Sequence, residues 1–470
     1  MSTRLATGGR LIDTDAPMRF TFNGKVMKGY AGDTLASALL ANDQMLVGRS
    51  FKYHRPRGIV ASGVEEPNAL VNLGVEGKFE PNQRATTTEL FDGLLATSQN
   101  HWPSLEFDVG ALNARLSRFM PAGFYYKMFI HPRPLWKHVY EPFIRQAAGL
   151  GQAPKGSDAD SYEHFYAFCD VLLLGAGIAG LLAAKSAAAA GARVLILEQT
   201  AHAGGRAPVD GGEVDGVPVD KVVDELLSSL VAMPNVTLRL RTMGAGVYDH
   251  GYVLGYERLT DHAPDQPGPR HRLWRIKAGQ VITATGAIER PLSFAGNDVP
   301  GVMLASAVRD YIVNYGVSPG DRVAVVTNND DAYRTAIAVK KAGLDVPVIL
   351  DARVLPADSP LMAEAKAAGI RVMMGHGVAA GQGGKRVTGV SVCAQAGEGA
   401  VLEEIGCDVV AMSGGWSPVV HLWSHCGGKL HWDNDYAMFR PDVHKAPQGG
   451  DGAAFVRAAG APFSNATTRT

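Results

Sequence analysis

Cysteine is scarce in this 470-residue chain, and the cysteines present form no recognisable pair. There are four of them, widely spaced and without a C-x-x-C motif: Cys169, Cys393, Cys407 and Cys426. This usage argues against a disulfide framework and predicts free thiols in a reducing compartment. His421 and His425 lie four residues apart beside Cys426, but no fourth ligand follows nearby. We therefore expect packing or polar contacts there, and no metal site.

Charge of one sign and long membrane-spanning runs are also missing. The net charge is −1, so composition favours neither nucleic acid nor an anionic membrane as a partner. Residues 1–15 are polar and lack the apolar core of a signal peptide, and the longest apolar region, 169–199, is interrupted by glycines and Lys185. The motifs H-E-x-x-H, G-x-S-x-G and the P-loop are absent. We expect a cytoplasmic protein in which no residue of this chain is catalytic.

Residues 169–199 are the stretch around which the rest is organised. An apolar run at 171–174 predicts a buried parallel strand, and Gly175, Gly177 and Gly180 then form G-x-G-x-x-G. An alanine-rich helix follows at 181–190, and a second strand ends at Glu198. The glycines permit a tight turn, close approach of a pyrophosphate, and close helix–strand packing.

This order of elements predicts a dinucleotide site. A helix N-terminus offers free N–H groups to a pyrophosphate, and Glu198 can accept hydrogen bonds from a ribose diol. The same carboxylate would repel a 2′-phosphate, so NAD or FAD is favoured over NADP. The fingerprint does not separate NAD from FAD, and glycines used only for packing are the simpler alternative.

The N-terminal region predicts a ferredoxin-like β-grasp domain. Residues 17–42 contain a hairpin signal at Asn23-Gly24, followed by a helix that Asp33 or Thr34 can cap. In iron–sulfur versions of this fold, cysteines in the next loop ligate the cluster. No cysteine precedes Cys169, so this domain cannot hold a cysteine-ligated cluster.

The loop after that helix is basic and aromatic. It contains Arg49, Phe51, Lys52, Tyr53, His54, Arg55 and Arg57. A solvated loop is the simplest interpretation, a docking surface for a partner subunit or an anionic group is the second, and single-stranded nucleic acid is the least favoured.

Further strands and helices predict a second nucleotide-type unit. Residues 321–350 form a β-α-β unit whose turn, Thr327 to Asp331, has no glycine triplet and ends in two aspartates. These carboxylates can cap the helix and would repel a phosphate, so we predict no nucleotide there. A buried strand within 407–417 is expected to return to the first sheet and bring Gly414 and Gly415 to the cofactor. The turn at Gly286 should return there as well.

Several long motifs resemble one family, the α subunit of heterotetrameric sarcosine oxidase. They are SFKYHRPRGI, PAGFYYKMF, YAFCDVLLLGAGIAG, ATGAIERPLSFAGNDVPGVML, TNNDDAY and SGGWSPVVHL. The resemblance spans residues 15–440 and implies a multidomain α/β and α+β chain, in which a cysteine-free β-grasp domain precedes a two-dinucleotide-binding, Rossmann-like flavoprotein reductase fold. The expected divisions are 1–97 (β-grasp), 98–163 (aromatic, proline-rich connector wrapping over other domains), 164–300 with 401–440 (dinucleotide-binding), 301–400 (inserted Rossmann-like domain) and 441–470 (irregular tail).

The resemblance also implies function. This chain would bind NAD within a complex with β, γ and δ subunits, and FAD and FMN would belong to the β subunit, where sarcosine is oxidised. Carried over by motif, Gly175, Gly177, Ala179 and Gly180 would line the pyrophosphate, and Glu198 and Gln199 would meet the ribose, with Arg206 alongside. The residues themselves also indicate that Gly204, Gly205 and Arg206 can close over the far side of a dinucleotide.

Two departures leave alternatives open. The aminomethyltransferase-like second half of the family's α subunit is not found in this sequence, and the final residues show no regular strand and helix to close the nucleotide domain. One alternative is an autonomous FAD-dependent dehydrogenase of opine-like secondary amines. Another is a structural subunit with a vestigial nucleotide site.

Overall fold

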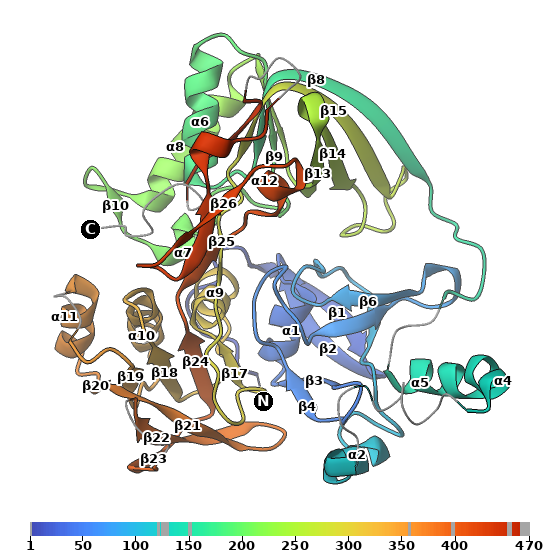
Figure 1. Ribbon diagram of the computed structural model, residues 1–470, viewed down its shortest axis with the longest axis vertical. Coiled ribbons are helices and arrows are strands. Elements are labelled where there is room, and N and C mark those ends of the chain that lie inside the picture. Colours follow the sequence, from blue (N-terminus) through green and yellow to red (C-terminus); the bar gives the residue numbers. More distant parts are fainter. Residues whose placement is uncertain are drawn as a thin grey trace. The chain divides into compact units, whose positions relative to one another are not determined.

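The computed structural model divides into two compact units, each built from two separated parts of the chain (Figure 1). Unit 1 comprises Met1–Ala159 and Pro291–Gly415, and unit 2 comprises Asp160–Arg290 and Trp416–Thr470. The structure describes residues 2–119, 123, 131–148, 153–355, 359–395, 400–448 and 454–460.

The first part of unit 1 is the predicted ferredoxin-like β-grasp domain. Its sheet has the order β2-β1-β7-β5-β6, with β1 parallel to β7 and antiparallel to β2. The elements are β1 (Asp13–Phe22), β2 (Lys25–Ala31), α1 (Leu35–Ala41), β3 (Leu46–Arg49), β4 (Pro56–Gly58), β5 (Leu70–Leu73), η1 (Glu76–Lys78), β6 (Glu80–Arg84) and β7 (Leu94–Thr97).

Local sequence rules account for the start of this domain. Asn23 and Gly24 both have positive φ, 50° and 78°, as the tight turn of the β1–β2 hairpin requires. Thr34 is the N-cap of α1: its side chain accepts the N–H of Ser37, and the Ser37 side chain accepts the N–H of Thr34. This capping box fixes a helix whose residues are all buried.

The connector consists of short helices with exposed apolar side chains. They are η2 (Val109–Ala111), α2 (Leu112–Arg115), η3 (Ser117–Phe119), α4 (Arg133–Leu135), η4 (Trp136–Tyr140) and α5 (Glu141–Ala148). Trp102, Phe107 and Phe143 are 70%, 71% and 72% exposed. That this connector wraps over other domains stays a prediction. Most of the PAGFYYKMF motif lies outside the described residues.

The second part of unit 1 is a parallel sheet of the predicted Rossmann-like type. Its order is β17-β24-β18-β19-β20, and Figure 1 shows α9 and α10 beside its strands. The elements are β17 (Val302–Leu304), α9 (Ala305–Tyr315), β18 (Val323–Thr327), α10 (Asp331–Lys341), β19 (Ile349–Asp351), α11 (Pro360–Ala367), β20 (Val372–Met374), β21 (His376–Gly383), β22 (Val387–Ala394), β23 (Glu403–Gly406) and β24 (Val409–Ser413). Strands β21, β22 and β23 form a separate antiparallel sheet.

Strand β24 corrects one prediction. We expected it in the sheet of the glycine fingerprint, but it lies between β17 and β18, parallel to both. Its residues are buried along the whole strand, so the sequence pattern shows that the strand is internal without showing which sheet it joins.

The two parts of unit 1 share one hydrophobic core. Phe20 and Leu39 of the β-grasp domain belong to the same cluster as Tyr311 and Val325 of the second sheet. The Tyr311 hydroxyl donates to the carbonyl of Ala61 at 2.9 Å. The β-grasp domain is therefore fixed against α9 rather than joined to it by a flexible link.

Unit 2 carries the glycine fingerprint on a sheet of order β12-β9-β8-β15-β14-β13, with β28 beside β15. Strands β12, β9, β8, β15 and β28 are parallel, whereas β13, β14 and the first half of β15 form the predicted meander. The elements are β8 (Tyr162–Leu174), α6 (Ile178–Ala189), β9 (Val194–Leu197), α7 (Ala207–Asp210), β10 (Glu213–Val214), β11 (Val217–Pro218), α8 (Val219–Val231), β12 (Val236–Arg239), β13 (Thr242–Tyr248), η5 (Asp249–Gly251), β14 (Tyr252–Arg258), β15 (His271–Thr283), β16 (Ala287–Glu289), β25 (Trp416–Pro418), α12 (His421–His425), β26 (Leu430–Asp433), β27 (Met438–Pro441), η6 (Val443–Lys445) and β28 (Val456–Ala458).

Two hydrophobic clusters cover the two faces of this sheet. Leu181 of α6 and Leu226 of α8 pack with Leu173 on one face, where Figure 1 shows both helices side by side. Trp423 of α12 and Trp274 of β15 belong to the second cluster. The sheet is therefore a middle layer, as a parallel nucleotide-binding sheet must be.

Strand β28 corrects the prediction of an irregular tail. It pairs in parallel with the end of β15, Val281 opposite Val456, and thus adds a strand to the sheet from residues in which we expected none. Residues 461–470 of the predicted tail lie outside the described residues. Within the described part of the chain, no helix combines the length and apolar character needed to cross a membrane.

Candidate functional site

The fingerprint turn joins β8 to α6, at the carboxyl end of the sheet, where α/β proteins bind ligands. Gly177 is the N-cap of α6, with extended backbone, and it provides no side-chain cap. No acidic residue lies in the first turn of α6. The N–H groups and positive dipole end of this helix therefore face the turn without a competing carboxylate in that first turn.

The three fingerprint glycines have different reasons to be glycine. A Cβ on Gly175 would lie 2.3 Å from the carbonyl oxygen of Ala284, and a Cβ on Gly180 would lie 2.1 Å from that of Gly175. At these two positions the neighbouring backbone leaves no room for a side chain. A Cβ on Gly177 would meet nothing nearer than the Cα of Gly205 at 3.9 Å. The space at Gly177 is open, which fits a ligand approaching the backbone there.

Glu198 lies at the end of β9, and its side chain turns toward the fingerprint turn. One carboxylate oxygen accepts the N–H of Ala176 at 2.9 Å, and the other accepts the N–H and hydroxyl of Thr200, each at 2.9 Å. The side chain is buried rather than directed into bulk water. Gln199 is exposed, and its carbonyl accepts a hydrogen bond from Arg258.

A second glycine turn closes against the first. Gly204 forms a β-bridge with Gly177, and its N–H donates to the carbonyl of Ala176 at 2.8 Å. A Cβ on Gly205 would lie 3.1 Å from the Cα of Gly177. Arg206 follows, with an ion pair to Asp210 at 2.9 Å.

Arg206 also reveals a residue that sequence analysis missed. Its guanidinium carbon lies 5.3 Å from the ring centre of Trp416, a cation–π distance. Trp416 begins β25, which pairs with β16 just after Gly286. Gly286 has a φ of 72°, and a Cβ there would meet nothing within 4 Å. In the sequence, the tryptophan inside the SGGWSPVVHL motif could have indicated this site residue.

Gly414 and Gly415 do not belong to the same unit as the other predicted site residues. They follow β24 and belong to unit 1, whereas the chain enters unit 2 at Trp416. Gly460 is a member that we did not predict. It follows β28, and a Cβ there would lie 2.8 Å from the Cβ of Ala179 in the first turn of α6.

In the second sheet, the corresponding turn lies between β18 and α10, and its aspartates form ion pairs. Asp330 is the N-cap of α10 but its side chain makes no capping bond, contrary to one alternative that we considered. It pairs with Arg353 at 2.7 Å, and Asp331 pairs with the buried Arg309 at 3.0 Å. The oxygen of the Asn329 side chain accepts the N–H of Asp331 instead.

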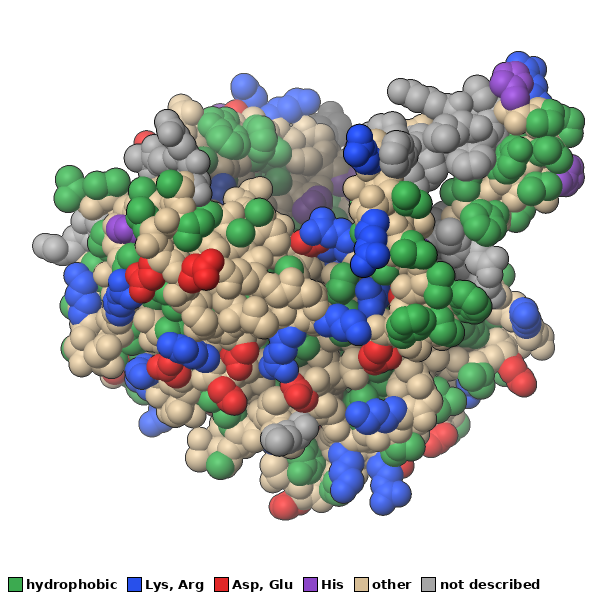
Figure 2. Space-filling view, turned by 90° about the horizontal axis from the view of Figure 1, so that it is seen from below, with side chains coloured by type: hydrophobic (Ala, Val, Ile, Leu, Met, Phe, Trp, Pro, Cys, Tyr) green, Lys and Arg blue, Asp and Glu red, His purple; other side chains and the backbone are tan. Residues whose placement is uncertain are grey.

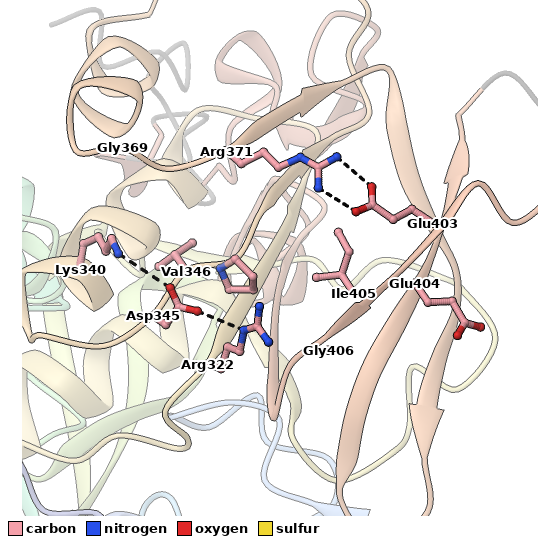
Figure 3. A pocket seen from close by; sticks show the side chains of 11 residues that line it. Arg322, Lys340, Asp345, Val346, Gly369, Arg371, Glu403, Glu404, Ile405 and Gly406 are labelled. Carbon is pink, nitrogen blue, oxygen red and sulfur yellow. Dashed lines mark hydrogen bonds and ion pairs between the residues drawn. The ribbon is translucent and has the colours of Figure 1, made fainter.

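A cavity of about 400 Å³ lies at the opposite, amino ends of these strands (Figure 3). Five of its charged side chains pair with one another: Arg322 and Lys340 with Asp345, and Arg371 with Glu403. Ligands of open α/β sheets bind at the carboxyl ends, so we assign no nucleotide to this cavity.

Three of the cysteine thiols, those of Cys169, Cys407 and Cys426, are poorly suited to redox chemistry. All four are free. Burial, the largest influence, raises the pKa of Cys169 and of Cys426 to about 11, and that of Cys407 to about 12. Thiols with such pKa values are almost wholly protonated near neutral pH and react slowly. Among the described residues no group of three or more His, Cys, Asp or Glu side chains could hold a metal ion.

The basic loop is largely engaged within unit 1. Arg49 is buried and donates to the carbonyls of His54 and Leu105. Arg55 and Arg57 both form ion pairs with Asp298. On the face shown in Figure 2, basic side chains are interspersed with acidic ones. These contacts favour a structural role for the loop's arginines.

Comparison with known proteins agrees with this arrangement. Residues 169–437 match the family described as pyridine nucleotide-disulphide oxidoreductase, and residues 15–101 match the family described as 2Fe-2S iron-sulfur cluster binding domain. Residues 15–101 contain no cysteine, so they do not fit a cysteine-ligated cluster.

The resemblance to sarcosine oxidase α subunits is confirmed. The chain is 48% identical to sarcosine oxidase subunit alpha of Rhizobium meliloti (strain 1021), over 93% of this chain and 44% of that protein. For the subunit of Corynebacterium sp. (strain P-1), the identity is 37% over 93% of this chain and 41% of the relative. The chain thus spans less than half the length of these relatives. The crystal structure of L-proline dehydrogenase from P. horikoshii shares the fold, with a TM-score of 0.64 and 21% identity, covering 99% of this chain and 72% of that one.

Proposed function

Because this chain belongs to the pyridine nucleotide-disulphide oxidoreductase family, we propose that it is the nucleotide-binding part of an amine-oxidising flavoenzyme complex of the sarcosine oxidase type. Sarcosine, dioxygen and water would give glycine, formaldehyde and hydrogen peroxide. Oxidation would take place at a flavin on a partner β subunit that holds FAD and FMN, in a complex with γ and δ subunits. The identity to two sarcosine oxidase α subunits supports this proposal.

The nucleotide proposed for this chain is NAD. The open space at Gly177 is the observation that carries the proposal, because a pyrophosphate needs close approach to the backbone at that glycine. The amides at the start of α6, including those of Ala179 and Gly180, would bind its phosphates. When bound, NAD supplies a nicotinamide ring that accepts a hydride.

The remaining residues would orient the nucleotide. The Glu198 carboxylate would accept hydrogen bonds from the adenosine ribose, with Gln199 beside it, and would disfavour a 2′-phosphate. Gly205 and Arg206 would cover the side opposite α6, and Gly286 would leave room for the nucleotide near Trp416. Gly414 and Gly415 of the SGGWSPVVHL motif are also proposed as nucleotide contacts.

One experiment tests the proposal directly. The chain is expressed alone, its visible spectrum is recorded, and the nucleotide released by denaturation is identified. A colourless protein that releases NAD supports the proposal. A yellow protein that releases FAD would instead indicate an autonomous flavin-dependent dehydrogenase, and the absence of any nucleotide would indicate a vestigial site. As an internal control, NAD and NADP are titrated in parallel, and Glu198 should make NADP bind at least about tenfold more weakly.

A further inference from the structure

The Glu66 carboxylate lies in a nest of backbone N–H groups in the β-grasp domain. One oxygen accepts the N–H groups of Val60 and Ala61, at 2.8 and 2.7 Å, and the other accepts those of Asn68 and Ala69, at 2.7 and 2.9 Å. Burial raises the pKa of Glu66, while these hydrogen bonds oppose the rise. All four partners are donors, which is the arrangement that an ionised carboxylate requires.

This nest is sealed from solvent. Glu66 is 1% exposed, and Ala61 and Ala69 are fully buried. The loop is also held from outside the β-grasp domain, because the Tyr311 hydroxyl donates to the Ala61 carbonyl and the N–H of Leu304 donates to the Val60 carbonyl at 2.8 Å. Because four fixed backbone donors bind this buried carboxylate, it holds the loop in its conformation.

The nest residues have the spacing of cluster ligands. Plant-type [2Fe–2S] sites use C-x4-C-x2-C followed by a more distant fourth cysteine. Positions 61, 66 and 69 have that spacing, and they hold Ala61, Glu66 and Ala69. Thr86 supplies a fourth position: it lies just beyond β6, is 3% exposed, and its hydroxyl donates to the carbonyl of Gly63 at 2.7 Å. All four positions lie inside the region that matches the 2Fe-2S cluster-binding family.

Convergent backbone N–H groups form concavities that bind anions, and many iron–sulfur sites are built on them. We propose that residues 58–69 are a cluster-binding loop in which the Glu66 carboxylate occupies the anion nest in place of the cluster. The loop keeps its conformation because the carboxylate satisfies donors that would otherwise face cluster sulfur. The β-grasp domain is then a structural element that supports α9, with no electron-transfer role of its own.

The first test restores the ligands. The full chain carrying A61C, E66C, A69C and T86C is reconstituted anaerobically with a ferric salt and sulfide. We expect two iron and two sulfide ions per chain, with the visible charge-transfer absorption of a [2Fe–2S] cluster. The matched control has the same number of cysteines beside the pattern: S62C, E65C, N68C and T87C. A folded four-cysteine chain that binds no more iron than this control overturns the proposal.

A second test does not depend on the cluster. Glu66→Gln keeps the shape of the side chain but replaces one acceptor oxygen with an NH2 group, which must face N–H donors. We expect a lower midpoint of thermal unfolding, whereas Glu65→Gln at the neighbouring, less buried glutamate should leave it unchanged. An unchanged midpoint in Glu66→Gln overturns the proposal.

If the four-cysteine chain does not fold without a cluster, it is refolded from denaturant with and without iron and sulfide. The proposal expects recovery only when both are present, because the nest then has no other anion. Failure to recover in either condition counts against it.

Discussion

The substitution Gly177→Ala separates nucleotide binding from folding. Gly177 has φ −70° and ψ 172°, which an alanine adopts without strain, and its new Cβ would lie 3.9 Å from the nearest atom, an ordinary contact. Alanine is a poorer N-cap than glycine by a fraction of a kcal/mol, but it lowers the entropy of the unfolded chain by a similar amount. We expect the free energy of unfolding of the nucleotide-free protein to change by less than about 1 kcal/mol.

Nucleotide affinity should respond much more strongly. The added methyl group occupies the space through which a pyrophosphate reaches the backbone, so we expect NAD affinity to fall at least about tenfold, or about 1.4 kcal/mol. Isothermal titration with NAD measures the affinity, and urea unfolding of the nucleotide-free protein measures the stability. Gly384→Ala is the matched control, because its Cβ would also enter open space, far along the chain in the β21–β22 turn.

The neighbouring glycine provides the contrast. In Gly175→Ala the Cβ would lie 2.3 Å from the Ala284 carbonyl oxygen at a φ of +113°, and backbone strain of this kind alone costs roughly 1–3 kcal/mol. We therefore expect Gly175→Ala to destabilise the chain whether or not nucleotide is present. The reasoning is refuted if Gly177→Ala binds NAD as the wild type does, or if it loses as much stability as Gly175→Ala.

Three further predictions follow from local contacts. Hydrogen bonds from Arg193 lower the pKa of Asp170 to about 2, below the value of about 3.9 in an unfolded chain. The stability from this pair is therefore present above about pH 4 and lost as the pH falls toward 2. Asp170→Asn should reduce this fall in the free energy of unfolding, measured with urea from about pH 2 to 6, and an unchanged pH dependence contradicts the assignment. Thr34→Ala removes the α1 cap and should cost about 1 kcal/mol, whereas Thr34→Ser should retain most of it in the same assay. Because burial raises the pKa of Cys169 and Cys426 to about 11, both thiols should react slowly with a disulfide reagent at pH 8 until the chain unfolds, and rapid labelling of the folded protein would disprove this.

Features set by neighbouring residues were predictable from the sequence. The Asn23-Gly24 turn, the Thr34 cap and the strand–turn–helix around Gly175 all depend on contacts within a few residues. Spacing along the chain is enough to define such features. The same is true of the second β-α-β unit at 321–350.

Features set by distant partners were not predictable in this way. Strand β24 is apolar throughout and would be equally well buried in either sheet, so its pairing with β17 and β18 could not be inferred from its composition. Strand β28 is three residues long and shows no periodicity, and Gly460 became a candidate only through its approach to Ala179. Glu66 looked like an ordinary loop residue because its partners are backbone groups, which leave no trace in the sequence.

The interleaving of the two units has a consequence for synthesis on the ribosome. The chain passes between the units three times, and β28 joins β15 only after residues 291–415 have been made. Until then, the end of β15 presents an uncovered row of backbone N–H and C=O groups, the kind of edge that invites mispairing and aggregation. A nascent chain stopped before residue 456 should therefore depend on chaperones far more than one that has just passed it.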